Sequence, residues 1–179
     1  MAMGHPNCIV QIVGYKNAGK TTTISKLIAA LEQRNLTSTV IKHHGHSSVP
    51  PKARYDSERF ITAGAKASFV EGGGEVSIQL KKEMSLTELL HLQSLVMTVD
   101  VVFVEGFKDT ILPNIVLLRD QGDLSLMNRA QTIGIVQRER FDVDRKGTAV
   151  FLRNEEEAWI SYFVNQIVEM RNEHVQNHL

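Results

Sequence analysis

The sequence predicts an α/β fold: one three-layer α/β/α domain with a mainly parallel sheet and a β-hairpin excursion. Short, continuously apolar runs recur along the chain, and such runs are typical of strands covered by helices on both faces. Amphipathic stretches separate these runs, and strands that alternate with helices form parallel sheets through crossover connections. With 179 residues, of which 42% are hydrophobic, the chain can bury the core of a single domain spanning 1–179.

The first strand and the first helix follow each other directly. Ile9–Val13 is an apolar run that ends at Gly14, as a buried strand would. The helix begins at about Thr21 and fades near Asn35, and its apolar face is formed by Ile24, Leu27, Ile28 and Leu31. Thr37–Lys42 is rich in β-branched residues and is predicted to be the next strand.

The middle of the chain predicts an antiparallel excursion. Asp56–Thr62 favours a short helix. Ala67–Glu71 and Glu75–Leu80 flank three consecutive glycines, and the second segment alternates apolar with polar residues, as a hairpin strand does. Its apolar face could be a dimer interface or could be covered by helices of the same chain, and the pattern does not separate these alternatives.

The rest of the chain supplies further helices and core strands. Ser85 followed by Glu88 is a capping-box pattern, and the helix that it starts runs to about Met97. Three more core strands are predicted at Val101–Val104, Ile115–Leu118 and Thr132–Val136. A long C-terminal helix is predicted to begin at Asn154, because three glutamates in its first turn complement the helix dipole.

Composition narrows the classes of partner and compartment. Lys and Arg total 20 and Asp and Glu total 20, so the net charge gives no reason to expect nucleic acid or a membrane surface as a partner. Cys8 is the only cysteine and can form no intramolecular disulfide. The most apolar run, around Leu95–Val104, is interrupted by Asp100 and is too short to cross a bilayer. We expect a soluble, cytoplasmic protein.

Gly14–Thr21 satisfies the phosphate-binding pattern G-x-x-x-x-G-K-[ST], the P-loop. Glycines let the loop wrap so that backbone N–H groups converge on phosphate oxygens, and the helix that follows adds its positive dipole end. Lys20 should reach the β- and γ-phosphates, and Thr21 should offer its hydroxyl to Mg²⁺. The predicted nucleotide-binding residues of this segment are Gly14, Asn17, Ala18, Gly19, Lys20, Thr21 and Thr22.

A magnesium site needs a carboxylate at the tip of a neighbouring strand, and Asp100 and Glu105 bracket one strand. Since five strand residues span about 16 Å, only one of the two can lie near the phosphates. Ligands gather at the carboxyl ends of parallel strands, which favours Glu105 and leaves Asp100 as a strand-start residue or cap. Asp56 is either a water-mediated Mg²⁺ contact or the cap of its helix. The predicted metal-site residues are therefore Thr21, Glu105 and Asp56.

Other polar residues lie beyond the predicted strand ends. Lys42 and Lys108 are placed to meet an anionic ligand or to carry surface charge. His43, His44 and His46 invite a metal-site interpretation, but adjacent residues of an extended chain point to opposite faces and no cysteine is near. A polar loop that contacts phosphate, a partner or solvent is favoured over a histidine metal site.

Four segments together resemble the MobB family, adaptor proteins of molybdopterin-guanine dinucleotide biosynthesis. They are the P-loop Gly14–Thr22, the segment Val40–His46 with its Lys-His-His-Gly-His sequence, Asp56 followed by Ala63-Gly64-Ala65, and Val102–Lys108 with its Glu-Gly-Phe-Lys sequence. The resemblance covers roughly Ile9–Leu118. It implies a Mg²⁺-dependent GTP-binding homodimer, at most a slow GTPase, that works beside the guanylyltransferase MobA. It also implies that Glu105–Lys108 faces the phosphates of GTP or the molybdopterin ligand.

Two features depart from the family pattern. Asn114 follows Pro113 where the family often has a lysine, which puts an anion contact there in doubt. The sequence also lacks an N-K-x-D segment, in which an aspartate accepts hydrogen bonds from guanine. Asp120 could do this from another position, although a surface turn at Arg119–Gly122 is favoured. The choice of GTP over ATP therefore rests on the resemblance.

Two rival functions stay open from the sequence. A P-loop small-molecule kinase would hold an acceptor in the segment His43–Arg59 and close an arginine lid, for which Arg138 and Arg140 are candidates. A nucleotide-driven metallochaperone would use the histidines after the second strand.

Overall fold

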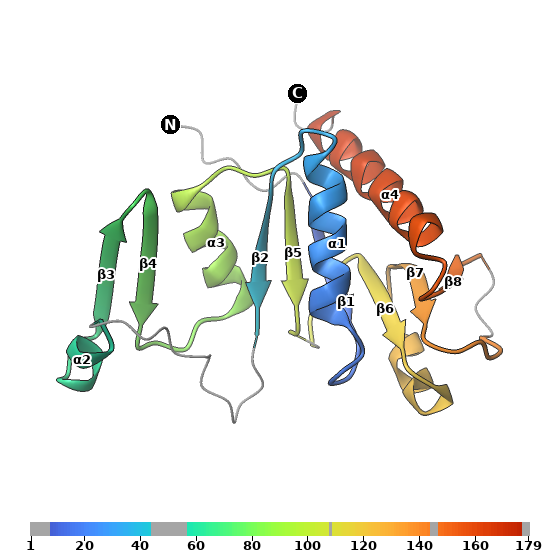
Figure 1. Cartoon of the computed structure of the whole chain (residues 1–179), viewed down its shortest axis with the longest axis horizontal. Helices are drawn as coiled ribbons and strands as arrows, with labels where there is room; N and C mark the ends of the chain where they lie inside the picture. Colours follow the sequence, from blue (N-terminus) through green and yellow to red (C-terminus); the bar gives the residue numbers. More distant parts are fainter. Residues whose placement is uncertain (1–7, 44–56, 108, 144–146, 177–179) are drawn as a thin grey trace. The chain divides into compact units, whose positions relative to one another are not determined.

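The computed structural model describes residues 8–43, 57–107, 109–143 and 147–176. The chain divides into two compact units, Met1–His43 with Leu90–Leu179 and, separately, His44–Leu89. Figure 1 shows the elements of both units along the chain. None of the helices in these described ranges is long and apolar enough to cross a bilayer.

The larger unit contains a six-stranded parallel sheet. Its strands are β1 (Ile9–Val13), β2 (Ser38–Lys42), β5 (Val101–Glu105), β6 (Asn114–Leu118), β7 (Thr132–Gln137) and β8 (Val150–Leu152). They lie in the order β2-β5-β1-β6-β7-β8, and every neighbouring pair is parallel. The prediction of a mainly parallel sheet is thus confirmed, and β1 lies between β5 and β6 with its carboxyl end at the same edge as theirs.

Two helices cover one face of this sheet. They are α1 (Lys20–Glu32) and α4 (Glu156–Gln176). Their buried side chains pack with alternate residues of the strands to form the main core: Val10, Ile12, Leu27, Leu31, Phe103, Ile115, Leu117, Trp159, Phe163 and Ile167. Cys8 is buried in the same core, and burial raises the pKa of its thiol to about 11.

The opposite face carries a 3-10 helix, η1 (Gln121–Asn128), where the sequence favours only a surface turn at Arg119–Gly122. Leu126 of η1 packs with Val13, Val116 and Ile135. The backbone N–H of Gly122 donates to the Asp120 carboxylate at 2.8 Å, so Asp120 caps η1 as the predicted surface turn requires. The edge strand β8 was not predicted either, because its three residues are too few to show a period.

The smaller unit contains the predicted hairpin. Strand β3 (Ala67–Gly72) pairs antiparallel with β4 (Glu75–Leu80), and α2 (Ser57–Thr62) precedes them. Gly73 and Gly74 have φ angles of 63° and 82°, the left-handed conformation that a two-residue hairpin turn needs. Apolar side chains stand exposed on both strands, among them Phe69, Val70, Val76, Ile78 and Leu80.

The helix α3 (Leu86–Val96) has the capping box that the sequence predicts. The Ser85 backbone N–H donates to the Glu88 carboxylate at 2.8 Å, and the Glu88 N–H donates to the Ser85 hydroxyl at 3.2 Å. The hydrogen bond from Lys82 and those from Ser85 lower the pKa of Glu88 to about 2. These bonds satisfy backbone groups that the first turn of a helix leaves without partners.

Asp100 lies at the amino end of β5 and ties three segments together. It accepts hydrogen bonds from the backbone N–H and the hydroxyl of Thr37, at 2.8 and 2.7 Å, and from Arg171, whose Nη2 lies 2.7 Å away. This confirms the prediction of a strand-start residue. Burial by itself raises the pKa of Asp100, but these bonds outweigh burial and leave the pKa below its ordinary value.

The lowered pKa predicts a pH-dependent contribution to stability. A carboxylate with a lower pKa in the folded chain than in the unfolded chain stabilises the fold above the unfolded pKa, and this contribution is lost as the pH falls through the folded pKa. We expect the melting temperature of Asp100→Asn to lie below that of the parent chain at pH 6, and the difference to shrink between about pH 4 and pH 3. Thermal unfolding followed by circular dichroism from pH 6 to pH 3 measures this, and a constant difference would contradict it.

Candidate functional site

The segment between β1 and α1 forms a tight loop at the carboxyl edge of the sheet. A Cβ at Gly14 would lie 2.8 Å from the Ala18 Cβ and 3.2 Å from the Leu117 carbonyl oxygen, so only glycine fits there. Gly19, directly before α1, has a φ of 93°, and Asn17 has a φ of 64°. The loop therefore has the close backbone packing and left-handed positions that a phosphate-binding loop requires.

Lys20 lies at the first position of α1 and its side chain folds back over this loop. The ammonium group donates to the backbone carbonyls of Gly14, at 3.1 Å, and Tyr15, at 3.0 Å. A positive charge is thereby held against the loop, beside the N-terminal end of a 13-residue helix, where the helix dipole adds to it. This arrangement suits a phosphate chain with several negative charges.

Thr21 and Glu105 come together as the sequence predicts. The Thr21 hydroxyl donates to the Glu105 carboxylate at 3.0 Å, and Glu105, the last residue of β5, is only 7% exposed. A hydroxyl and a carboxylate are the oxygen ligands that Mg²⁺ prefers in nucleotide sites. The ammonium of Lys42 already lies against both, 3.1 Å from the hydroxyl and 3.2 Å from the carboxylate. The chemistry of this oxygen pair therefore fits a cation.

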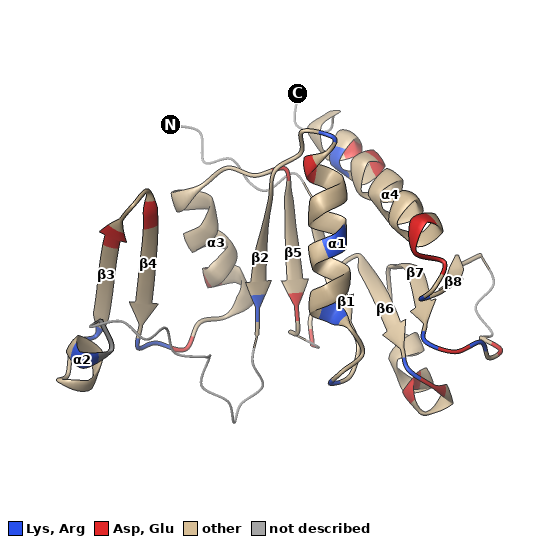
Figure 2. Ribbon diagram, in the orientation of Figure 1, with Lys and Arg blue, Asp and Glu red and all other residues tan. Residues whose placement is uncertain are grey.

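Lys42 pairs with the Glu105 carboxylate, a contact that was not predicted from the sequence. Lys42 and Glu105 end adjacent parallel strands and stand opposite each other in the register, so their charges pair at the sheet edge. In Figure 2 the lower end of β2 is blue and the lower end of β5 is red for this reason. The Lys42 side chain is 38% exposed, which agrees with the alternative that it carries surface charge, and a contact with an anion stays a prediction.

Sequence reasoning missed Gln11, which holds the loop after Glu105. Gln11 lies in the central strand β1 and is fully buried, and its amide donates to the carbonyls of Gly106, at 2.6 Å, and Phe107, at 2.9 Å. These two residues have positive φ angles of 96° and 53°, so the chain turns sharply at this point. The one available signal was a polar residue inside an otherwise apolar strand.

His43 lies beside the same loop. Its backbone N–H donates to the Glu105 carbonyl at 2.8 Å, and its ring centroid lies 4.8 Å from that of Phe107. His44, His46, Asp56 and Lys108 lie outside the described residues, so their predicted roles stay predictions. In the described part of the chain, no three His, Cys, Asp or Glu residues are grouped as metal ligands.

The remaining candidates have structural partners. The Asn114 side chain is buried and donates to the carbonyls of Leu112, at 2.9 Å, and Ala130, at 2.7 Å, which commits it to the connection between strands. Arg138 donates to the Asn17 carbonyl at 2.9 Å, and Arg140 forms an ion pair with Glu155 at 3.7 Å. The two arginines therefore have different surroundings, although they stand two residues apart.

Comparison with known proteins identifies the family of this chain. Residues 9–148 match the family model of MobB, described as molybdopterin guanine dinucleotide synthesis protein B. A Bacillus subtilis protein named probable molybdopterin-guanine dinucleotide biosynthesis adapter protein is 32% identical over 84% of this chain and 88% of its own length. An Escherichia coli adapter protein of the same name is 33% identical over 63% of this chain and 66% of its own length.

Solved structures agree as well. A crystal structure of Bacillus subtilis MobB is similar with a TM-score of 0.78 at 30% identity, covering 91% of this chain and 97% of that one. A MobB homologue from Bacillus stearothermophilus has a TM-score of 0.73 at 28% identity, covering 90% and 98%. The parallel sheet, its flanking helices and the hairpin thus match a known fold. The chain belongs to the MobB family, the adapter proteins of molybdopterin-guanine dinucleotide biosynthesis.

Proposed function

We propose that this chain binds GTP together with Mg²⁺ through residues 14–22 and Glu105, and that it assists the guanylyltransferase MobA as an adaptor. The observation that carries the proposal is the convergence at one sheet edge of a phosphate-binding loop, the Lys20 ammonium and the Thr21–Glu105 oxygen pair. Each of these groups complements a different part of a Mg²⁺-nucleotide: the phosphate oxygens or the metal ion.

The roles of the individual residues follow from their chemistry. The backbone N–H groups of Asn17 and Gly19 and those at the start of α1 would donate to phosphate oxygens, and Lys20 would exchange its carbonyl partners for the β- and γ-phosphates. Thr21 and Glu105 would hold Mg²⁺ directly or through water, and Thr22 would add its N–H at the helix start. Bound Mg²⁺ supplies charge neutralisation of the phosphates.

Hydrolysis should be slow, because rapid phosphoryl transfer needs a group that orients the attacking water and usually an arginine on the transferred phosphate. The Gln11 amide is committed to loop carbonyls beneath the site. Arg138 and Arg153 donate to carbonyls of the P-loop. These engagements favour a nucleotide-bound adaptor over an efficient enzyme.

The names of the relatives support the choice of partners. The relatives are named for the biosynthesis of molybdopterin-guanine dinucleotide. The guanylyl half of this dinucleotide can be supplied by GTP. We propose that the chain acts as a cytoplasmic homodimer and that the segment Glu105–Lys108 faces GTP or molybdopterin. The exposed apolar side chains of β3 and β4 would supply part of a protein interface.

The test combines hydrolysis with partner activity. Phosphate release from Mg²⁺-GTP is followed with the purified chain alone, and guanylyl transfer by MobA to molybdopterin is followed with and without the chain. The proposal predicts release far below the turnover of about 10 s⁻¹ that is ordinary for enzymes, together with faster guanylyl transfer. Release at that ordinary rate, or transfer unaffected by the chain, would contradict the adaptor role.

A further inference from the structure

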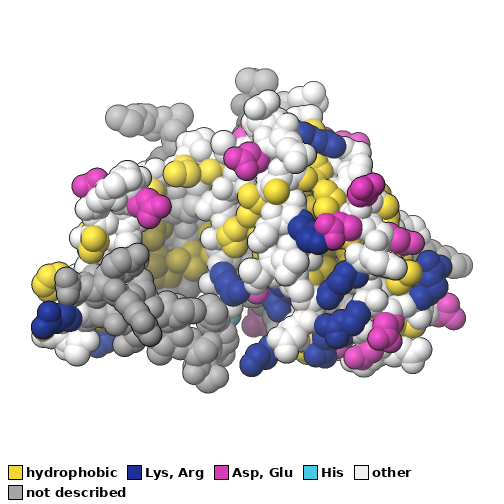
Figure 3. Space-filling model, viewed as in Figure 1, with side chains coloured by type: hydrophobic (Ala, Val, Ile, Leu, Met, Phe, Trp, Pro, Cys, Tyr) yellow, Lys and Arg dark blue, Asp and Glu magenta, His cyan; other side chains and the backbone are white. Residues whose placement is uncertain are grey.

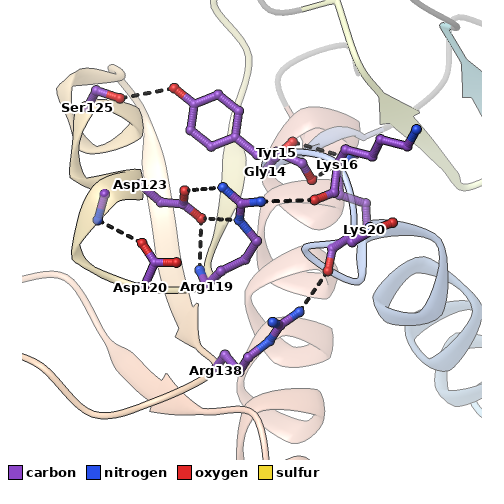
Figure 4. A network of polar contacts seen from close by, with 11 residues as sticks. Gly14, Tyr15, Lys16, Lys20, Arg119, Asp120, Asp123, Ser125 and Arg138 are labelled. Carbon is purple, nitrogen blue, oxygen red and sulfur yellow. Dashed lines mark hydrogen bonds and ion pairs between the residues drawn. The ribbon is translucent and has the colours of Figure 1, made fainter.

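Three arginines, each directly after a different strand, donate to three successive carbonyl groups of the P-loop. The pairs are Arg119 with the Lys16 carbonyl at 3.3 Å, Arg138 with the Asn17 carbonyl at 2.9 Å, and Arg153 with the Ala18 carbonyl. Each arginine is the first residue after its strand: β6 ends at Leu118, β7 at Gln137 and β8 at Leu152. Figure 4 shows the contacts of Arg119 and Arg138 beside the loop.

Each arginine that holds a carbonyl of the loop also orients the N–H of the next residue. In a planar trans peptide the C=O and N–H bonds point in opposite directions, and the peptide bonds of the described residues are trans. A carbonyl held on the outer side of the loop therefore turns the N–H of the next residue to the inner side. The Ala18 N–H is used within the loop, since it donates to the Tyr15 carbonyl at 3.1 Å.

We propose that Arg119, Arg138 and Arg153 form a clamp on the outer side of the P-loop that fixes its peptide groups, so that the N–H groups of Asn17 and Gly19 stay directed toward bound phosphate while that of Ala18 stays on the Tyr15 carbonyl. This inference rests on the proposed function and extends it by naming positioning residues of the phosphate site. A guanidinium on a carbonyl also polarises the peptide and makes its N–H a stronger donor to an anion. None of the three arginines needs to touch the phosphates to act in this way.

The charges around the clamp agree with this role. Arg119 has a carboxylate partner, Asp123, at 2.8 Å, and its guanidinium lies 5.3 Å from the centre of the Tyr15 ring. Among the described residues, Arg138 and Arg153 form no ion pair with a carboxylate, although the charge of Arg138 helps to lower the pKa of Asp123. Burial and then the charge of Arg138 lower the pKa of Arg153, so the two guanidinium groups are near each other. Figure 3 shows Lys and Arg side chains gathered on this part of the surface.

The packing of Arg153 explains one further requirement of the loop. A Cβ at residue 19 would lie 2.8 Å from Nη2 of Arg153 and 3.1 Å from its Cζ. Gly19 is needed for its left-handed φ, and its lack of a Cβ lets the Arg153 guanidinium lie against the loop. The loop sequence and the arginine after β8 are matched to each other.

The experiment compares Arg138→Gln with Arg140→Gln. Both residues are exposed and lie two positions apart, and both substitutions remove one positive charge, but only Arg138 contacts the P-loop. Two quantities are measured for each variant: hydrogen exchange of the amides of residues 16–19 by NMR without nucleotide, and the affinities for Mg²⁺-GTP and for Mg²⁺-pyrophosphate. The loss of one hydrogen bond to a charged group corresponds to a loss of affinity by a factor of about 10 or more.

If the clamp exists, Arg138→Gln should speed hydrogen exchange of the loop amides. It should also lower the affinities for Mg²⁺-GTP and for Mg²⁺-pyrophosphate by the same factor of about 10, at both 0.05 M and 0.5 M salt. Arg140→Gln should leave the exchange unchanged, and any effect on affinity should vanish at high salt. Arg138→Lys should recover part of the loss, because an ammonium can still donate to the Asn17 carbonyl. Arg153→Gln should repeat the result of Arg138→Gln.

Equal effects of Arg138→Gln and Arg140→Gln, both removed by salt, would show that the arginines act only through overall charge and would overturn the clamp. Unchanged amide exchange in Arg138→Gln would overturn it as well. Failure of the parent chain to bind any nucleotide would instead overturn the proposed function, while the exchange measurement would still decide whether the arginines order the loop.

Discussion

Lys20→Ala lowers the affinity of the chain for Mg²⁺-GTP by a factor of at least about 100, the largest effect that we expect from one substitution. The ammonium now donates to two loop carbonyls, 3.1 and 3.0 Å away, and is placed to serve two phosphates instead. Hydrogen bonds to charged groups contribute about 1.5–3 kcal/mol each, and two of them correspond to at least a factor of about 100. Fluorescence titration with a mant-labelled GTP measures the loss.

Lys26→Ala is the matched control for Lys20→Ala. Lys26 lies on the same helix, α1, but it forms a surface ion pair with Glu156, the first residue of α4. Such pairs contribute less than about 1 kcal/mol to stability, so this variant should fold and bind as the parent chain does. A loss of similar size in both variants would mean that positive charge on α1, and not the position of Lys20, governs binding.

Glu105→Gln abolishes most of the dependence of GTP affinity on Mg²⁺. The carboxylate lies 3.0 Å from the Thr21 hydroxyl and 3.2 Å from the Lys42 ammonium, and the amide that replaces it cannot neutralise a divalent cation. We expect the ratio of affinities with and without Mg²⁺ to fall by a factor of about 10 or more, as the loss of one charge-assisted contact implies. Affinity measured in EDTA should hardly change.

Asp109→Asn controls for charge in the Glu105→Gln experiment. Asp109 is an exposed carboxylate four residues further along the same loop. Its substitution should leave the Mg²⁺ dependence of GTP affinity intact. An unchanged Mg²⁺ dependence in Glu105→Gln would remove Glu105 from the metal site, whereas an equal loss in both variants would point to the general negative charge of this edge.

The part of the site that lies close together in the sequence could be predicted from it. Gly14–Thr21 is a contiguous motif, and the buried strand before it and the amphipathic helix after it can be recognised from the local sequence. Glu105 could also be chosen over Asp100, because a strand has two ends and ligands collect at one of them. In the structure Asp100 pairs with Arg171 at the other end of β5.

The supporting residues could not be predicted, because their partners lie far away along the chain. Gln11 donates to residues 95 and 96 positions away, and Arg153 donates to a carbonyl 135 positions away. Such pairs depend on the order of the strands, which places β6, β7 and β8 in succession on one side of the P-loop strand. Apolar patterns indicate which segments are strands but not which strands become neighbours. The pairing of Lys42 with Glu105 was missed for the same reason.

Titration calorimetry of GTP and of ATP, each with Mg²⁺, into the parent chain tests whether this chain is a GTP-binding member of its family. A GTP-binding adaptor should give a saturable heat for GTP with one site per chain and much weaker binding of ATP. Tighter binding of ATP, or no heat with either nucleotide, would contradict this assignment.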